Sequence, residues 1–140
     1  MTTLAQGGQK VSTNPVWSIT GSDVQRSQAF YEAVLGFQKI ADYGPRAVMM
    51  KGSVMLVLGP PPDPSQATAG DRFNPNRVGL DHLSFAVESH EELERAQRVL
   101  AERGVEYKYI KDLGPGFGLY VFAFRDPDNI ALELTAPYPH

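Results

Sequence analysis

His82 and Glu133 are the two residues whose types and positions point most directly to chemistry in this chain. Each lies in a short segment with the alternating apolar pattern of a β-strand. Imidazole nitrogens and carboxylate oxygens bind divalent metals, and the same two groups can exchange a proton. We therefore take both residues as candidate catalytic residues and candidate metal ligands.

Each of these residues also has a less specific interpretation. A single strand histidine is often a hydrogen-bonded structural residue or a substrate contact. An ionised carboxylate on a partly buried face needs a partner, because removing its charge from water is costly. The candidate partners of Glu133 are His82 and Arg125, and Arg125 has a second interpretation as a turn-stabilising residue. A His82–Glu133 pair would be a residual metal site, an acid/base dyad or an anchor for a polar ligand group.

The other two histidines add little to such a site. His90 is predicted in the first turn of a helix, where it would face solvent. His140 is the terminal residue and would reach a pocket only in a favourable assembly.

The two candidate residues belong to the second copy of a unit that the sequence contains twice. The first copy spans residues 16–59 and the second spans residues 82–135. When the copies are superposed, Val16 takes the place of the histidine and Val57 takes the place of the glutamate. At these two positions, only the second copy therefore carries side chains that bind metals or protons.

Both copies predict a strand, a helix and three further strands. The first helix is predicted to begin near Ser22, which has capping-box spacing to Gln25, and to end at Gly36. Ser89 and Glu92 repeat that spacing at the second helix, which Gly104 closes. The predicted strands are 16–20, 38–43, 46–51 and 53–58, then 82–87, 106–111, 118–125 and 130–135. The predicted buried helix positions are Ala29, Phe30, Ala33 and Val34, then Leu93, Ala96, Val99 and Leu100.

These patterns divide the chain into four segments. The segment between the copies is dense in Pro, Gly, Asp and Asn and has no apolar period, which is typical of a linker or of a mobile cover. We expect a flexible tail at 1–13, a first module at 14–59, a linker or pocket cover at 60–80 and a second module at 81–137.

A single helix can cover only one face of a four-stranded sheet, so each module must leave one face free. Two such faces can join into a shared concave pocket. Strand alternation places both His82 and Glu133 on that face. The other residues predicted to line the pocket are Val16, Ser18, Met55, Val57, Ser84, Val121, Ala123 and Arg125.

Composition excludes several functional classes. The chain has 140 residues, 42% of them hydrophobic, which is enough to build a core. Its net charge of −3 argues against a nucleic-acid partner. It has no cysteine, so thiolate ligands and nucleophiles are excluded. No apolar run approaches the length of a membrane span, and the polar N-terminus lacks a signal-peptide pattern, so we expect a cytoplasmic protein without a membrane partner.

Three motifs, in this order and spacing, resemble the vicinal oxygen chelate superfamily, which includes glyoxalase I, bleomycin-resistance proteins, fosfomycin-resistance enzymes and extradiol dioxygenases. They are SDVQRSQAFYEAVLGF (22–37), DHLSFAV (81–87) and FRDPDNIALEL (124–134). The resemblance covers roughly residues 14 to 137. It implies an α+β fold of two tandem βαβββ modules, whose open, curled mixed sheet surrounds a concave pocket with one helix outside each sheet. It also implies a homodimer.

Metal-using members of that superfamily take their ligands from the first and fourth strands of the modules. His82 and Glu133 match the second-module pair, whereas Val16 and Val57 cannot coordinate a metal. The resemblance therefore implies either no cofactor or a weakly held divalent metal such as Fe, Mn, Ni or Zn.

Three functions remain open on the sequence alone. The first is a glyoxalase- or bleomycin-resistance-like protein that binds a small, partly hydrophobic or aromatic organic molecule without a complete metal site. The second is a metal-dependent lyase, isomerase or ring-cleaving dioxygenase that uses His82 and Glu133. The third is an accessory protein that holds a substrate for a biosynthetic pathway.

Overall fold

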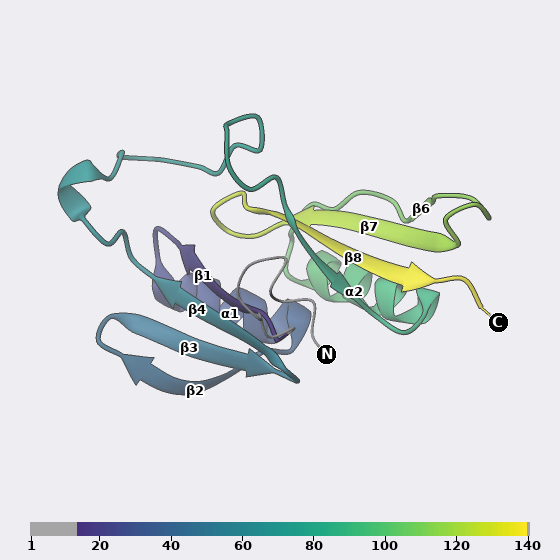
Figure 1. The fold of residues 1–140 in the computed structure, drawn as a ribbon, viewed down its shortest axis with the longest axis horizontal. Helices are drawn as coiled ribbons and strands as arrows, with labels where there is room; N and C mark the ends of the chain where they lie inside the picture. Colours follow the sequence, from purple (N-terminus) through teal and green to yellow (C-terminus); the bar gives the residue numbers. More distant parts are fainter. Residues whose placement is uncertain (1–13, 140) are drawn as a thin grey trace, which may run out of the picture.

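Two modules of matching topology make up the computed structural model, which describes residues 14–139 (Figure 1). The predicted 1–13 tail lies outside the described residues. The first module contains β1 (Val16–Thr20), α1 (Val24–Leu35), β2 (Gln38–Tyr43), β3 (Arg46–Lys51) and β4 (Val54–Gly59). The second contains β5 (Leu83–Ala86), α2 (His90–Glu102), β6 (Lys111–Asp112), β7 (Leu119–Arg125) and β8 (Ala131–Pro137). Neither helix is long and apolar enough to cross a membrane.

The two sheets have the same strand order and the same register. The first is ordered β1-β4-β3-β2 and the second β5-β8-β7-β6. β1 runs parallel to its neighbour β4, and β5 runs parallel to its neighbour β8. Ser18 pairs with Val57 in the first sheet, and Ser84 pairs with Glu133 in the second. The register therefore makes Val57 the counterpart of Glu133, as the repeat predicted.

Both helices lie on the same side of the two sheets (Figure 1). The core between helices and sheets is one continuous cluster that draws on both modules. Aromatic side chains connect the halves: the ring centroids of Trp17 and Phe85 are 5.6 Å apart, and those of Phe37 and Phe85 are 5.9 Å apart. The α+β architecture of two such modules, with sheets that remain open, confirms the predicted fold class.

The start of α1 differs from the prediction. Asp23, not Ser22, is the N-cap, and its carboxylate accepts a hydrogen bond from the backbone N–H of Arg26 at 3.1 Å. The predicted stripe is also partly wrong, because Ala29 and Ala33 are exposed. The spacing of apolar residues could not predict the buried face of α1, since two residues on that face, Ser27 and Tyr31, carry hydroxyl groups. The buried residues of α1 are Ser27, Phe30, Tyr31 and Leu35.

The second module departs from the prediction at two places. Ser89 is the N-cap of α2, but its side chain makes no capping hydrogen bond. The strand predicted at 106–111 is reduced to the two-residue β6 and an isolated bridge from Tyr107 to Phe124. Residues 106–109 are all exposed, so a longer strand would bury little apolar surface there.

The linker between the modules is fixed at one point. Its regular structure is limited to a short 3₁₀ helix, Pro64–Gln66. The Phe73 N–H donates to the carbonyl of Asp128 at 2.9 Å, and the Asn129 side chain donates to the carbonyl of Phe73 at 2.9 Å. The linker is thus anchored to the β7–β8 turn.

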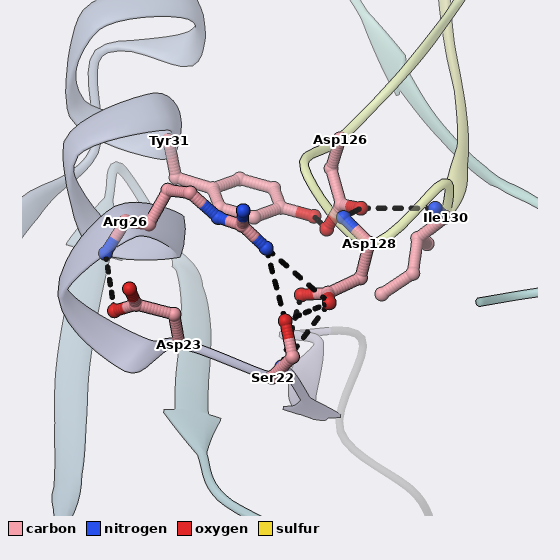
Figure 2. A network of polar contacts seen from close by, with 7 residues as sticks. All are labelled: Ser22, Asp23, Arg26, Tyr31, Asp126, Asp128 and Ile130. Carbon is pink, nitrogen blue, oxygen red and sulfur yellow. Dashed lines mark hydrogen bonds and ion pairs between the residues drawn. The ribbon is translucent and has the colours of Figure 1, made fainter. Parts of the chain in front are cut away.

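A polar network joins α1 of the first module to that same turn of the second (Figure 2). The Tyr31 hydroxyl donates to Asp126 at 2.9 Å. The Asp126 carboxylate is buried and also accepts the backbone N–H groups of Asp128 and Ile130. Burial raises the pKa of Asp126, while these hydrogen bonds act in the opposite direction. Because it is almost fully enclosed, the carboxylate depends on these donors.

A second carboxylate of the turn holds the residue before the helix cap. The Ser22 hydroxyl donates to Asp128 at 2.5 Å, and the Ser22 N–H points to the same carboxylate at 3.2 Å. The Arg26 guanidinium lies 3.7 Å from Asp128 and donates to the Ser22 hydroxyl (Figure 2). Ser22 therefore connects the modules instead of capping α1.

We predict that Tyr31→Phe lowers the free energy of unfolding by about 1.5–3 kcal/mol, because it removes a hydrogen bond to a buried carboxylate. Urea denaturation followed by circular dichroism would measure the loss. Tyr109→Phe is the matched control: Tyr109 is 74% exposed, and its substitution should change stability by less than about 0.5 kcal/mol. Equal stability of the two variants would show that the Tyr31 hydroxyl does not hold the modules together.

Candidate functional site

His82 and Glu133 come together on the face of the second sheet opposite α2. His82 immediately precedes β5, and Glu133 lies in the middle of β8, the parallel neighbour of β5. His82 Nε2 lies 3.5 Å from Glu133 Oε1. The histidine side chain is 39% exposed and the glutamate side chain 25% exposed, so both can be reached from solvent.

Two further residues orient this pair. Asp81 Oδ1 lies 2.8 Å from His82 Nδ1, and the Ser84 hydroxyl donates to Glu133 Oε1 at 2.8 Å. Nδ1 therefore carries a proton, and in a neutral ring the unprotonated Nε2 would face a carboxylate. An imidazolium removes this conflict, because both ring nitrogens then donate.

The pKa of His82 reflects these neighbours. The hydrogen bond to Asp81 raises it above its ordinary value, and the Glu133 carboxylate adds to the increase, while partial burial acts in the opposite direction. Sequence analysis did not select Asp81, although its position next to His82 in the chain was the available signal.

The predicted lining residues of the first module lie on the corresponding open face. Val16 and Ser18 are exposed, and Met55 and Val57 are half-buried, whereas their strand neighbours Trp17, Leu56 and Leu58 pack toward the core. In the second module Val121 and Ala123 are half-buried and Ser84 is exposed. Ala123 pairs directly with Glu133 across the β7–β8 ladder. In the second module, the aliphatic side chains of Val121 and Ala123 thus lie beside the polar pair.

Arg125 is directed away from this pair. Its Nη1 donates to the carbonyl of Asn129 at 3.1 Å, which holds the β7–β8 turn. It also lines a cavity of about 520 Å³ together with Arg26 and Glu102. The partner of Glu133 is therefore His82, and Arg125 has the turn-stabilising role that was its second interpretation.

The cavities of about 770 and 520 Å³ lie away from the His82–Glu133 pair. One cavity, of about 770 Å³, lies between the end of β1, the linker and the β7–β8 turn, and its walls include Thr20, Arg26, Phe73 and Asp128. Neither it nor the smaller cavity includes His82 or Glu133.

The donor set does not complete a catalytic metal site. Within residues 14–139, no group of three or more His, Cys, Asp or Glu side chains is gathered so as to hold a metal ion. His82 and Glu133 supply two donors, while catalytic zinc sites take about three from the protein. The corresponding first-module positions are Val16 and Val57, which have no donor atom. His90 lies against the Tyr120 ring, with a centroid distance of 4.8 Å, and His140 lies outside the described residues.

Fold and site together define a two-module α+β protein whose second module carries His82 and Glu133 on the open face of its sheet. Residues 14–134 match the family model of the Glyoxalase/Bleomycin resistance protein/Dioxygenase superfamily. The chain belongs to this superfamily.

The chain is similar to several individual proteins of this kind. The chain is 35% identical over 124 residues to the uncharacterized protein YwkD of Bacillus subtilis (strain 168), covering 84% of this chain and 91% of YwkD. It is similar to a putative glyoxalase from Bacillus halodurans, with a TM-score of 0.71, 26% identity and coverage of 96% and 99%. It shares the fold, at 19% identity, of a mutant of the fosfomycin resistance protein FosX from Listeria monocytogenes complexed with Mn(II) and 1S,2S-dihydroxypropylphosphonic acid. That match has a TM-score of 0.68 and covers 89% of this chain and 90% of FosX.

We predict that His82 titrates above its ordinary pKa of about 6.5 and that Asp81→Asn lowers this value. The Asp81 interaction stabilises the fold at pH values below the unfolded histidine's pKa, and this contribution disappears as pH rises through the folded pKa. NMR titration of the His82 ring proton would measure both values. An unchanged His82 pKa in the variant would show that Asp81 does not hold the ring.

Proposed function

We propose that this protein binds a small, partly hydrophobic or aromatic organic molecule on its open sheet face, without a complete metal site. One observation carries the proposal: His82 and Glu133 lie 3.5 Å apart on that face, whereas valines occupy both corresponding positions of the first module. The pair would anchor a polar group, and the valines would contact an apolar body.

The surroundings of the pair support this proposal. Met55, Val57, Val121 and Ala123 are half-buried on the open faces and have no polar side-chain group to satisfy. Contact with them would be favourable by about 25 cal/mol for each Å² of apolar surface removed from water. Small-molecule sites commonly combine such a surface with a few placed polar groups.

A second candidate function is an enzyme of the lyase, isomerase or ring-cleaving dioxygenase type. The observation in its favour is the chain of contacts from Asp81 through His82 to Glu133, which would suit proton transfer. The FosX relative was crystallised with Mn(II), so a divalent metal is the cofactor to test.

We predict that the neutral fluorescent probe N-phenyl-1-naphthylamine binds the protein in the presence of EDTA. Val57→Asn should weaken binding about tenfold, because it places an unpaired amide against the probe. A fluorescence titration would give both dissociation constants. Val78→Asn is the matched control, since Val78 lies fully exposed on the linker and its substitution should leave binding unchanged.

Metal retention separates the two candidate functions. The purified protein would be loaded anaerobically with Fe(II), Mn(II), Ni(II) or Zn(II), desalted and analysed for metal. We expect far less than one ion per chain. Near-stoichiometric retention that is lost in His82→Ala would contradict the binding proposal and favour the enzyme, as would loss of turnover by orders of magnitude in Glu133→Gln.

We also propose that a second copy of the chain covers part of the open face. Val16 is 65% exposed there, and apolar faces of this kind commonly mark interfaces. Sedimentation equilibrium should show a species of twice the 15.4 kDa chain mass. Val16→Glu should shift it toward the monomer while Val78→Glu does not. A wild-type monomer at high concentration would refute the homodimer.

A further inference from the structure

The two carboxylate oxygens of Glu133 have different surroundings. Oε1 accepts the Ser84 hydroxyl at 2.8 Å and lies 3.5 Å from His82 Nε2. Oε2 has no donor among the residues that the structure describes. The Glu133 side chain is 25% exposed, so the carboxylate can be reached from solvent.

Ser84 fixes the orientation of the carboxylate. It pairs with Glu133 across the parallel β5–β8 ladder, so the two side chains project from the same face of neighbouring strands. The ladder sets the backbone, and the hydroxyl then selects Oε1 as its acceptor. Ser84 is in this sense a positioning residue that leaves Oε2 for the ligand.

The charges around the pair favour a ligand group that donates a hydrogen bond over one that accepts it. Asp81 and Glu133 place two carboxylates around one imidazole, so the cluster stays negative even when His82 is protonated. Arg125, on the same strand as Ala123, donates to the carbonyl of Asn129 and not to Glu133. A ligand carboxylate would meet like charge here.

We propose that Oε2 of Glu133 receives a hydrogen-bond donor of the ligand, a protonated amine or a hydroxyl group on an aromatic or aliphatic body, and that the site disfavours carboxylates. This assignment rests on the proposed binding function and specifies its ligand class. A protonated amine is the stronger of the two donors, because its hydrogen bond to a carboxylate is charge-assisted.

Three probes with the same aromatic body test this assignment: 1-naphthylmethylamine, 1-naphthalenemethanol and 1-naphthoate. Isothermal titration calorimetry on the full chain at neutral pH and low salt would rank them. We expect the amine to bind tightest, the alcohol next and the carboxylate at least tenfold more weakly than the amine. In Glu133→Gln, the amine and the alcohol should bind within about threefold of one another.

Ser84→Ala tests the positioning role through the ratio of amine to alcohol affinity, which a general loss of structure would not change selectively. We expect this ratio to fall severalfold and to be restored in Ser84→Thr, which keeps the hydroxyl. Ser65→Ala is the matched control. It removes a serine–carboxylate hydrogen bond of 2.7 Å to Asp63 on the linker and should leave the ratio unchanged.

Each other outcome has a definite meaning. If the carboxylate binds as tightly as the amine, or if the amine preference persists in Glu133→Gln, the assignment to Oε2 is overturned while the binding function stands. If none of the three probes binds, both the assignment and the proposed function are overturned.

Discussion

One helix can cover only one face of a four-stranded sheet, and this chain places both of its helices on the same side. The buried apolar side chains of the strands therefore belong to one core, and the residues that alternate with them point to the opposite face. The site follows from this alternation, because Ser84 and Glu133 occupy strand positions whose side chains point away from the core. The open face is a geometric consequence of having two α-helices for eight strands within residues 14–139.

The two modules have the same topology, but their corresponding turns contribute differently to the contact between the modules. Tyr31 and Ser22 of the first module bond to Asp126 and Asp128 in the β7–β8 turn of the second (Figure 2). The corresponding β3–β4 turn of the first module, at residues 52 and 53, is a glycine and a serine with no carboxylate. The second module therefore differs from the first at two places: the polar residues on its open face and the carboxylates of the turn that contacts the first module.

The repeat, the order of helices and strands along the chain and the face on which His82 and Glu133 lie could be predicted from the sequence, because they follow from alternation and from internal similarity. The family resemblance and the fold class are confirmed. The burial of Tyr31 could not be predicted from helical spacing, since a tyrosine hydroxyl enters a core only when a distant partner, here Asp126, receives it. The cap at Asp23 was missed for a related reason, because Ser22 is taken by Asp128.

Phe73 divides the 60–80 linker into two parts. With its N–H and its carbonyl both bonded to the β7–β8 turn, the segment is two short loops that share a fixed point. The entropy of closing each loop depends on its own length and rises slowly with it. Residues added or lost before Phe73 would therefore leave the approach to His82 undisturbed. The length of the segment before Phe73 can thus vary while the distance between His82 and Glu133 is preserved.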